Sequence, residues 1–414
     1  MRVLVVSFYY EPDLSAGSFR ATALVAAMRE RAPPGTHIDV ITTLPNRYHS
    51  YVKEARELEV SEGLEIKRIA LPTHRSDMAG QSRAFLSFAR GALAHVAGRD
   101  YDIVVATASR LMPATLGAWI ARRKGARLYL DIRDLFVDNM RELLPPVLAW
   151  LVGTIFSPIE SWTMRQADRI NLVSRGFESY FRSRYGDRAL TWFTNGIDDE
   201  FLAAAPQAAI PRRLGREVIV LYAGNIGQGQ ALHEVLPNLS VALRGRARFV
   251  VIGDGGRRAA LERAIAGSEN VELRAPLPRA ALLDAYRSAD VLFLHLGALR
   301  AFEAVLPSKV FEYAALGKPV LAGVAGYAAS FIRDEVANSA VFPPGNVAEA
   351  VKAFESLELI DRPRPEFTAK YARSHIARAM ANDVFALGPE PAGESGLKRS
   401  SPLGTSHDSH QRYR

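Results

Sequence analysis

Lys309 and Glu312 stand three residues apart in an otherwise apolar stretch, which reads FEAVLPSKVFEYAALGKPVLAGV at residues 302–324. A helix is predicted to begin near Pro307 and to end at Gly317. The two charges could form a surface ion pair on an amphipathic helix, or they could face a ligand. A cation in the first helical turn is unfavourable against the helix dipole unless an anion lies there as well. The position of Lys309 therefore favours a diphosphate at this helix end.

Two glycine-containing turns could hold phosphates. The stretch VIVLYAGNIGQGQALHEVL passes from a strand through a turn into a helix, and the turn contains Gly224, Asn225 and Gly227. Glycines lose much backbone entropy on folding, so their density here favours close approach of the backbone to a ligand. Near the N-terminus, Gly17 and Ser18 open a helix after the first strand, where free N–H groups and the helix dipole suit a phosphate. The alternative for Gly17 is an ordinary turn glycine.

These groups need a scaffold, and the alternation of short β-branched runs with longer helical patterns predicts βα units and parallel sheets. The runs are almost continuously apolar, as in strands that are covered on both faces. In the first half they occupy residues 2–8, 37–43, 64–70, 102–108, 127–132 and 169–174. In the second half they occupy residues 218–224, 247–253, 270–275, 290–296, 318–324 and 339–345. The predicted fold class is α/β with doubly wound parallel sheets.

The alternation is interrupted once, which predicts two domains. Residues 201–216 are rich in Ala, Pro and Arg without a strand period, and they are interpreted as an interdomain linker. The domains are predicted at 1–200 and 217–386, with the last helix of the second packing back on the first. Residues 387–414 are polar and rich in Pro, Gly and Ser, and we expect them to be disordered.

The composition limits the class of function. The chain has 414 residues, of which 48% are hydrophobic and 23% charged, as is typical of a soluble globular protein. The absence of cysteine excludes disulfides, thiolate metal sites and a cysteine nucleophile. The net charge of +8 favours an acidic partner such as nucleic acid, anionic lipid or a phosphorylated substrate. Because the basic residues are spread along the chain without a nucleic-acid-binding motif, no nucleic acid is expected.

One apolar segment raises the question of a membrane. Residues 143–156, LLPPVLAWLVGTIF, are too few to span a bilayer and contain a proline pair. Residues 1–194 carry 26 Lys and Arg against 20 Asp and Glu. A basic surface with an apolar patch suits peripheral binding to anionic lipid, while a buried helix of the first domain is the alternative. The N-terminus, MRVLVVSFYY, is predicted to be a strand and not a signal peptide.

Four segments together resemble the family 4 retaining glycosyltransferases of the GT-B fold. They are GNIGQGQ, ADVLFLHL, LPSKVFEYAALGKPVLAG and NGIDDEF. The similarity covers residues 1–386, and its most specific part is PSKxxEY. The branch that it most resembles builds O-antigen, capsule or exopolysaccharide. The resemblance implies two Rossmann-like domains that face each other across a cleft, the N-terminal one for the acceptor and the C-terminal one for a nucleotide-sugar.

The resemblance also implies an activity. We expect transfer of a sugar, an N-acetylated hexose from a UDP-sugar, with retention of configuration. The expected acceptor is a lipid-diphosphate-linked or other saccharide of surface polysaccharide biosynthesis. No metal and no cofactor are expected, because no DxD motif occurs in a convincing context. The implied location is the cytoplasm, at the inner face of the plasma membrane, with peripheral contact to anionic lipid.

Residue roles follow from the resemblance. Glu312 matches the glutamate that receives the ribose hydroxyls. The donor diphosphate is expected near Gly17, Ser18, Gly224, Asn225, Gly227, Ser308 and Lys309. The nucleobase is expected to pack near Arg274 and Leu277. The candidate catalytic residues are Glu303, Asp131 and Asp134, of which the two aspartates lie in an acidic loop, DIRDLFVDN, expected near the acceptor.

The sequence departs from the family pattern in three places. Eight residues separate Glu303 from Glu312, where the family has seven, and Ala304 occupies the expected position. The Arg and Lys that many members carry after the GN loop are replaced by Asn225, Gln228 and Gln230. The chain reads TASRLMP where many relatives have a histidine. These departures leave a non-catalytic nucleotide-sugar-binding subunit as an alternative. A UDP-sugar 2-epimerase or a phosphorylase of the same fold is a further one, although neither has a recognisable acid/base or pyridoxal-phosphate motif here.

Overall fold

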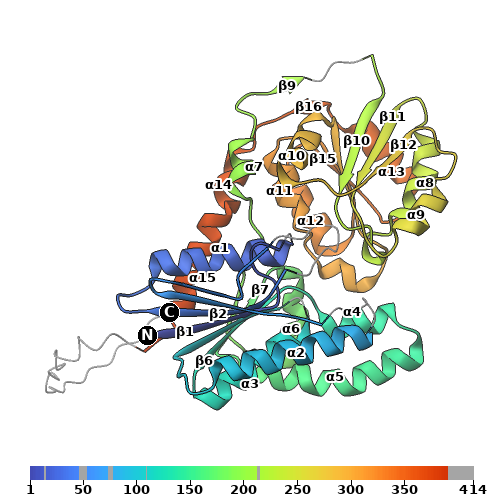
Figure 1. Ribbon diagram of the computed structural model, residues 1–414. Helices are drawn as coiled ribbons and strands as arrows, with labels where there is room; N and C mark the ends of the chain where they lie inside the picture. The colour runs from blue at the N-terminus through green and yellow to red at the C-terminus, as the bar shows by residue number, and fades with distance from the viewer. Residues whose placement is uncertain (14, 46–53, 73–77, 109, 212–214, 390–414) are drawn as a thin grey trace, which may run out of the picture.

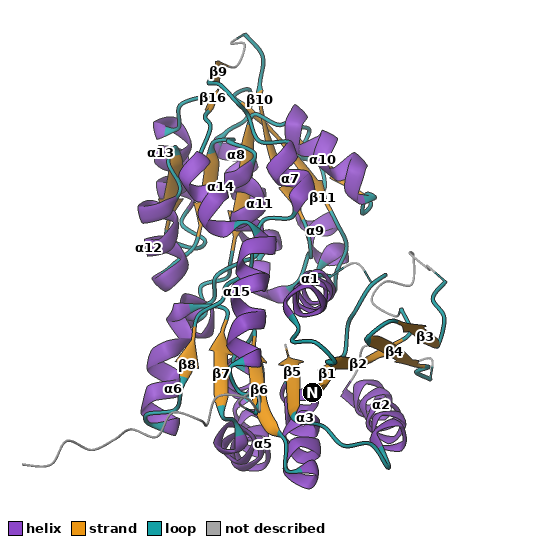
Figure 2. Ribbon diagram, turned by 90° about the vertical axis from the view of Figure 1, so that its left-hand side faces the viewer, coloured by secondary structure: helices purple, strands orange, loops and turns teal. Residues whose placement is uncertain are grey.

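The structure is a computed structural model that describes residues 1–13, 15–45, 54–72, 78–108, 110–211 and 215–389. It contains two α/β units, one above the other in Figure 1. Each unit is a twisted, mainly parallel sheet with helices on both faces, as Figure 2 shows. The α/β class and the two doubly wound sheets predicted from the alternating pattern are confirmed.

The N-terminal sheet has the strand order β3-β4-β2-β1-β5-β6-β7-β8, and only the β3–β4 pair is antiparallel. The bounds are β1 Arg2–Ser7, β2 His37–Thr43, β3 Leu58–Ser61, β4 Leu64–Ile69, β5 Ile103–Ala108, β6 Arg127–Ile132, β7 Arg169–Leu172 and β8 Leu190–Thr191. All six runs predicted as strands form strands. The two short strands β3 and β8 lie at the sheet edges and were not predicted.

The helices of this unit cover two faces of its sheet. They are α1 Ala16–Arg31, α2 Met78–Val96, α3 Leu111–Lys124, α4 Phe136–Leu143, α5 Pro146–Gln166 and α6 Glu178–Tyr185, with a 3₁₀ turn, η1, at Arg175–Phe177. Buried side chains of α2, α3 and α6 form one core with the sheet, whereas α1 and the C-terminal helix α15 (Arg373–Phe385) form the core on the other face. The end of the chain therefore completes the first unit.

The C-terminal sheet has the order β12-β11-β10-β13-β14-β15 and is parallel throughout. The bounds are β10 Val218–Ala223, β11 Ala247–Ile252, β12 Val271–Arg274, β13 Val291–His295, β14 Val320–Gly323 and β15 Ser339–Phe342. The helices are α8 Leu232–Ala242, α9 Arg258–Ala264, α10 Arg279–Ser288, α11 Lys309–Ala315, α12 Gly326–Glu335 and α13 Val347–Ser356. The 3₁₀ turns η2 and η3 lie at Gln228–Gln230 and Arg300–Ala304. The strand order places β13 beside β10, so the loops after these two strands meet at one edge.

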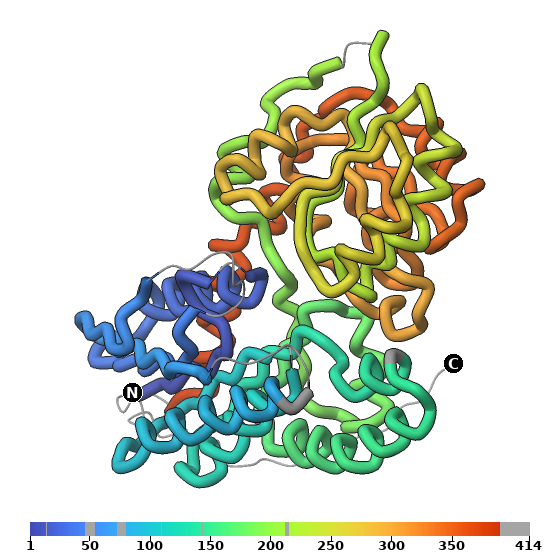
Figure 3. Tube along the Cα trace, turned by 45° about the vertical axis from the view of Figure 1, so that its right-hand side comes forward, coloured from blue at the N-terminus to red at the C-terminus, as the bar shows by residue number. Residues whose placement is uncertain are grey.

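The chain passes between the units twice, which Figures 2 and 3 allow the reader to follow. On the way up, residues 201–216 include the end of α7 (Asp199–Ala203) and β9 (Ile210–Pro211). Strand β9 pairs antiparallel with β16 (Ile360–Asp361), so this segment contains a strand that its composition did not predict. The chain returns through α14 (Pro365–Tyr371) into α15.

The predicted disordered tail, 387–414, falls mostly outside the described residues, which end at 389. Leu387 packs against the core of the first unit. A Cβ atom placed on Gly388 would contact the Met1 sulfur, so the chain still follows the first unit here.

The apolar segment 143–156 forms the end of α4 and the first half of α5. Val147, Trp150 and Ile155 are 72%, 67% and 56% exposed. The buried-helix reading is therefore wrong for these side chains. Within the described ranges, no helix combines the length and apolar character needed to cross a membrane.

Candidate functional site

Lys309 and Glu312 lie at the start of α11 in the C-terminal unit, next to Ser308, which lines a pocket together with residues of the N-terminal unit. The ammonium of Lys309 is 4.0 Å from the carboxylate of Glu312, and their side chains are only 24% and 14% exposed. Tyr286 donates a hydrogen bond of 3.3 Å to Glu312, and Arg279 lies 3.9 Å from its other oxygen. The two charges do pair, but they are mostly buried. The surface-pair reading is therefore wrong.

Lys309 lies directly against the first glycine turn. A Cβ atom on Gly224 would overlap the Cε of Lys309, and Gly224 has a φ of 154°, which favours glycine. A Cβ on Gly253, in the loop after β11, would overlap the carbonyl of Gly224. These glycines let two loops and a lysine side chain pack together without a gap. Burial lowers the pKa of Lys309, and Glu312 opposes that shift.

The turn that contains Gly224, Asn225 and Gly227 is closed by its own hydrogen bonds. Tyr222 donates to the Asn225 carbonyl at 2.6 Å. The Asn225 amide and the Gly227 N–H both donate to the Gln230 side chain, at 2.9 and 3.2 Å. A phosphate that binds these donors must displace the Gln230 amide oxygen. The phosphate contacts expected for Asn225 and Gly227 therefore stay a prediction.

His295, at the end of β13, hydrogen-bonds to the Gln230 carbonyl at the end of this turn. Gly345 N–H donates to its Nε2 at 3.1 Å, so Nδ1 carries the proton and donates to the Gln230 carbonyl at 2.8 Å. Burial lowers the pKa of His295 to about 4, which keeps the ring neutral at physiological pH. The ring is 1% exposed. His295 thus positions the glycine turn relative to β13 and was missed by sequence reasoning.

The expected nucleobase positions lie near the end of β12. Arg274 is exposed and its guanidinium pairs with Glu272 at 2.7 Å. The Arg274 carbonyl accepts from Gly253 N–H at 3.2 Å, which ties this strand end to the loop behind Gly224. Leu277 packs partly buried against the core that contains α11. Both residues therefore lie on the same sheet edge as the glycine turn, and their contact with a base stays a prediction.

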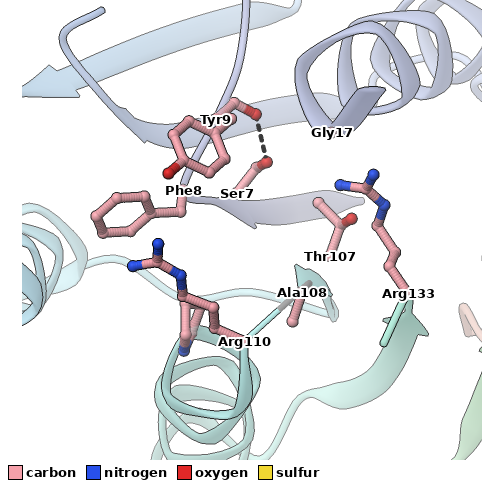
Figure 4. Close-up of a pocket in the computed structure, with 9 residues that line it drawn as sticks. Ser7, Phe8, Tyr9, Gly17, Thr107, Ala108, Arg110 and Arg133 are labelled. Carbon is pink, nitrogen blue, oxygen red and sulfur yellow. Dashed lines mark hydrogen bonds between the residues drawn. The ribbon is translucent and has the colours of Figure 1, made fainter. Parts of the chain in front are cut away.

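Gly17 and Ser18 lie in the first turn of α1, above the carboxyl edge of the N-terminal sheet. Ser15 caps the helix by accepting from the Ser18 N–H at 3.1 Å. Figure 4 shows the Arg133 guanidinium beside Gly17, and a Cβ atom on Gly17 would overlap it. The same close-up shows Arg110 beside Phe8, on the other side of a narrow pocket. Gly17 is thus required by the close approach of Arg133.

Asp131 and Asp134, the two expected acceptor-side carboxylates, have different surroundings. Asp131 is fully buried, and Arg20 binds both of its oxygens at 2.8 Å. Thr107 and Asn171 add hydrogen bonds of 2.9 and 2.7 Å. These contacts join α1 to β5, β6 and β7 and leave no oxygen for a substrate. The structure therefore supports a positioning role for Asp131, and its catalytic role stays a prediction that these contacts do not favour.

Asp134 lines a pocket of about 140 Å³ between the two units. Arg133 and Asn195 line it from the same unit, while Pro307 and Ser308, just before Lys309, line it from the other. Burial raises the pKa of Asp134 to about 6, and Arg133 opposes the shift. This pocket brings one expected catalytic residue and one expected donor residue together.

Glu303 does not line that pocket. It lies in η3, its side chain is exposed, and its backbone packs against Gly326 at the start of α12. It lines a groove of about 840 Å³ between the units, together with Arg141, Arg184 and Arg300. The groove was not predicted, because its walls come from α4, α6, η3 and α12, which are far apart in sequence.

One group of possible metal ligands occurs in the described part of the chain: His37, Asp39 and Glu65. Its carboxylates already pair with arginines, Arg2 at 3.1 Å from Asp39 and Arg99 at 2.9 Å from Glu65. Two fixed guanidinium groups oppose the binding of a further cation, so we interpret the group as an ion-pair network.

Comparison with known proteins gives two family matches. A model described as glycosyl transferases group 1 matches residues 217–358, and a model described as a glycosyl transferase 4-like domain matches residues 17–195. The probable glycosyltransferase WbjE of Pseudomonas aeruginosa is 25% identical over 250 residues, which are 57% of this chain. The match spans 61% of the length of that curated relative.

Solved structures share the fold. Sucrose-phosphate synthase from Thermosynechococcus elongatus has a TM-score of 0.68 at 14% identity, over 93% of this chain and 98% of its own. HepE of Anabaena, in complex with UDP, has a TM-score of 0.51 at 14% identity, over 94% of this chain and 97% of its own. At such low identity the likeness shows the architecture alone.

Proposed function

Because the chain belongs to the family 4 glycosyltransferases of the GT-B fold, we propose that it transfers a sugar from a nucleoside diphosphate to a saccharide acceptor. The observation that carries this proposal is the position of Lys309 and Glu312. They lie at the start of α11, against the Gly224 turn and beside the pocket between the units. A shielded lysine ammonium binds a diphosphate well, and a shielded carboxylate accepts hydrogen bonds from ribose hydroxyls.

In the proposed reaction, the bond between the sugar C1 and the β-phosphate oxygen breaks, and the acceptor oxygen forms a new bond to C1. The acceptor proton passes to the departing diphosphate. Negative charge grows on that diphosphate, so fixed positive groups such as Lys309 stabilise the transition state more than the ground state. Retention of configuration follows if the acceptor attacks from the face that the diphosphate leaves. No metal takes part in this scheme.

We propose UDP as the nucleotide and an N-acetylated hexose as the sugar. HepE, which shares the fold, was solved in complex with UDP, and this supports uridine among the bases. The nucleobase would lie near Arg274 and Leu277, and the ribose near Glu312. The Gly17–Ser18 turn and Ser308 would lie next to the phosphates, from opposite sides of the pocket.

For the acceptor we propose a lipid-diphosphate-linked saccharide in surface polysaccharide biosynthesis, bound in the groove of about 840 Å³. Arg141 and Arg300 line this groove, and neither pairs with a carboxylate in the described part of the chain. The groove adjoins α4 and α5, whose exposed apolar side chains would lie in the lipid. An anionic groove ligand with an apolar tail matches this arrangement.

Exchanging both Leu148 and Trp150 for aspartate is expected to reduce binding to anionic liposomes by at least tenfold. These side chains are 48% and 67% exposed, so their loss leaves the core intact, while two new carboxylates oppose both insertion and anionic lipid. Co-sedimentation with phosphatidylglycerol vesicles measures the effect. The matched control is Val241→Asp, which changes a 60% exposed apolar residue on the other unit. Equal binding by the double variant and the wild type would overturn the membrane contact.

The rate of transfer is expected to rise between pH 5 and pH 7, with a midpoint near 6. Burial raises the pKa of Asp134 to about 6, so its carboxyl group is neutral below that pH. Only above it is the group a charged acceptor for the hydrogen bond that orients the acceptor hydroxyl, whose proton passes to the departing diphosphate. The pH profile of kcat/KM should lose this limb in Asp134→Asn. A limb that persists unchanged in the variant would assign it to another group.

Incubation with a panel of nucleotide-sugars tests the proposed function. Release of the nucleoside diphosphate in the presence of a membrane extract is the expected result. Donor binding without turnover across the panel and a range of extracts would instead support a non-catalytic binding subunit. That alternative is favoured by one observation, the exposure of Glu303 away from the Lys309 pocket.

A further inference from the structure

The donor side of the cleft carries little positive charge for a diphosphate. The turn from Gly224 to Gln230 contains no cation, and its amide donors are occupied by Gln230. Lys309 shares its charge with Glu312, 4.0 Å away. Arg279 is held by Asp198 and Glu200. At the start of α11, a diphosphate of two or three negative charges therefore meets a lysine whose charge is partly neutralised.

The opposite wall of the cleft holds a guanidinium without a partner. Among the described residues, the Arg133 side chain has no hydrogen-bond or ion-pair partner, and its Nε is buried. Asp134 is the next residue in sequence and acts on the Arg133 charge, but no hydrogen bond or ion pair joins the two side chains. Asp131, two residues before Arg133, has both of its oxygens bound by Arg20. Burial lowers the pKa of Arg133, opposed by Asp134 and Asp131, and the cations Arg20 and Arg373 lower it further.

The buried charge of Arg133 destabilises the folded protein unless an anion or a hydrogen-bond acceptor compensates it. Removing a guanidinium from water without pairing costs several kcal/mol, so chains rarely keep one without a use. The fold nevertheless makes room for it, because any side chain larger than that of Gly17 would displace it. The arrangement keeps the guanidinium at the amino end of α1, a 16-residue helix, where an anion is favoured.

The pocket in front of Arg133 contains a second polar group without a partner. Asn195, 6% exposed, lines the same pocket of about 140 Å³, and its Oδ1 is buried and unbonded in the described part of the chain. Across this pocket lies Ser308, the residue before Lys309. Two unsatisfied polar groups that meet in one cavity indicate a polar ligand between them.

We propose that Arg133 of the N-terminal unit is a diphosphate-binding residue that completes the donor site opposite Lys309. The inference rests on the proposed function and deepens it. The departing diphosphate would be held between two cations from different units, so the full positive charge is present only when both units contribute. In this arrangement Arg133 supplies a positive charge that the neutral side chains Asn225, Gln228 and Gln230 do not supply.

The test compares the full-length protein with Arg133→Met and Arg133→Lys, using UDP, UMP and inorganic pyrophosphate as probes in calorimetric titrations. Arg133→Met is expected to weaken UDP and pyrophosphate binding by about 10- to 100-fold and to change UMP binding by less than threefold. Arg133→Lys keeps a charge and should recover part of the loss. Arg127→Met, at the exposed start of β6, the strand that ends just before Arg133, is the matched control and should bind all three probes normally.

A purely structural role for Arg133 would weaken all three probes together and lower the melting temperature, and it would overturn the proposal. So would unchanged UDP binding in a folded Arg133→Met variant when the wild type binds UDP. Absence of any binding by the wild type, tested also with ADP, GDP and the corresponding sugar nucleotides, would instead remove the proposed function and this inference with it.

Discussion

Replacing Glu312 by alanine should weaken the binding of the nucleotide-sugar by about 10- to 100-fold and leave the protein folded. The carboxylate accepts from Tyr286 and lies close to Lys309 and Arg279, so its orientation is set before a ligand arrives. Hydrogen bonds from two ribose hydroxyls to such a fixed carboxylate contribute about 1.5–3 kcal/mol. Because they exist in the ground state as well as in the transition state, Kd and KM should rise more than kcat falls.

Titration of UDP and of UMP measures this effect, and both should weaken because both contain the ribose. The matched control is Glu349→Ala. Glu349 also pairs with a lysine three residues away, Lys352 at 2.8 Å, but on an exposed helix face. The control should bind as the wild type does. Normal affinity in a folded Glu312→Ala variant would remove the role proposed for this carboxylate.

Replacing Lys309 by methionine should lower kcat by about 10²- to 10³-fold. The apolar side chain of methionine fills much of the space against Gly224, so the loops should keep their positions. What is lost is a fixed positive charge beside the place where negative charge develops, and the removal of one such group typically has this effect. Since the charge on the diphosphate grows during the reaction, kcat should fall more steeply than KM rises.

The measurement is single-turnover transfer at saturating donor, with the melting temperature as a check on folding. Lys352→Met is the control, because Lys352 belongs to the exposed pair on α13. If Lys309→Met raised KM alone and left kcat unchanged, its charge would act in uniform binding. If it left both constants unchanged, the diphosphate would lie elsewhere.

Most of the fold could be predicted from the chain because the strands of a doubly covered parallel sheet are continuous apolar runs. Each of the twelve predicted runs became a strand. The missed strands β3, β8, β9 and β16 are two to four residues long, lie at edges or in a separate pair, and are partly or largely exposed. Backbone pairing alone holds them, and pairing leaves no apolar pattern in so short a segment.

The proposed donor half of the site could also be predicted from the sequence, because it is built from features that each occupy one short stretch. A glycine turn after a strand and a lysine at a helix start are local signals. Their meeting follows from strand order, since β10 lies beside β13 and the loops at the carboxyl ends of neighbouring parallel strands meet at one edge. The contact of Gly224 with Lys309 is the result.

The proposed acceptor half could not be predicted from the sequence, because its chemistry depends on which charges are paired. Asp131 and Arg133 are two residues apart and looked like parts of one acidic loop. Only the folded chain brings Arg20, 111 residues away, onto Asp131 and leaves the Arg133 guanidinium without a partner among the described residues. In the same way, composition could not tell whether the apolar face of α5 was buried, since burial depends on what packs against it.

The sequence by itself therefore determined the α/β class, the two doubly wound sheets, and the glycine turn and first-turn lysine of the proposed donor side, since these depend on periodicity and local backbone preference. The tertiary structure decided which carboxylate is occupied and which guanidinium is free. It also decided that Glu303 lies away from the pocket with Lys309, and that an apolar helix face is left exposed. Those outcomes depend on distances between residues far apart in the chain, which no local pattern contains.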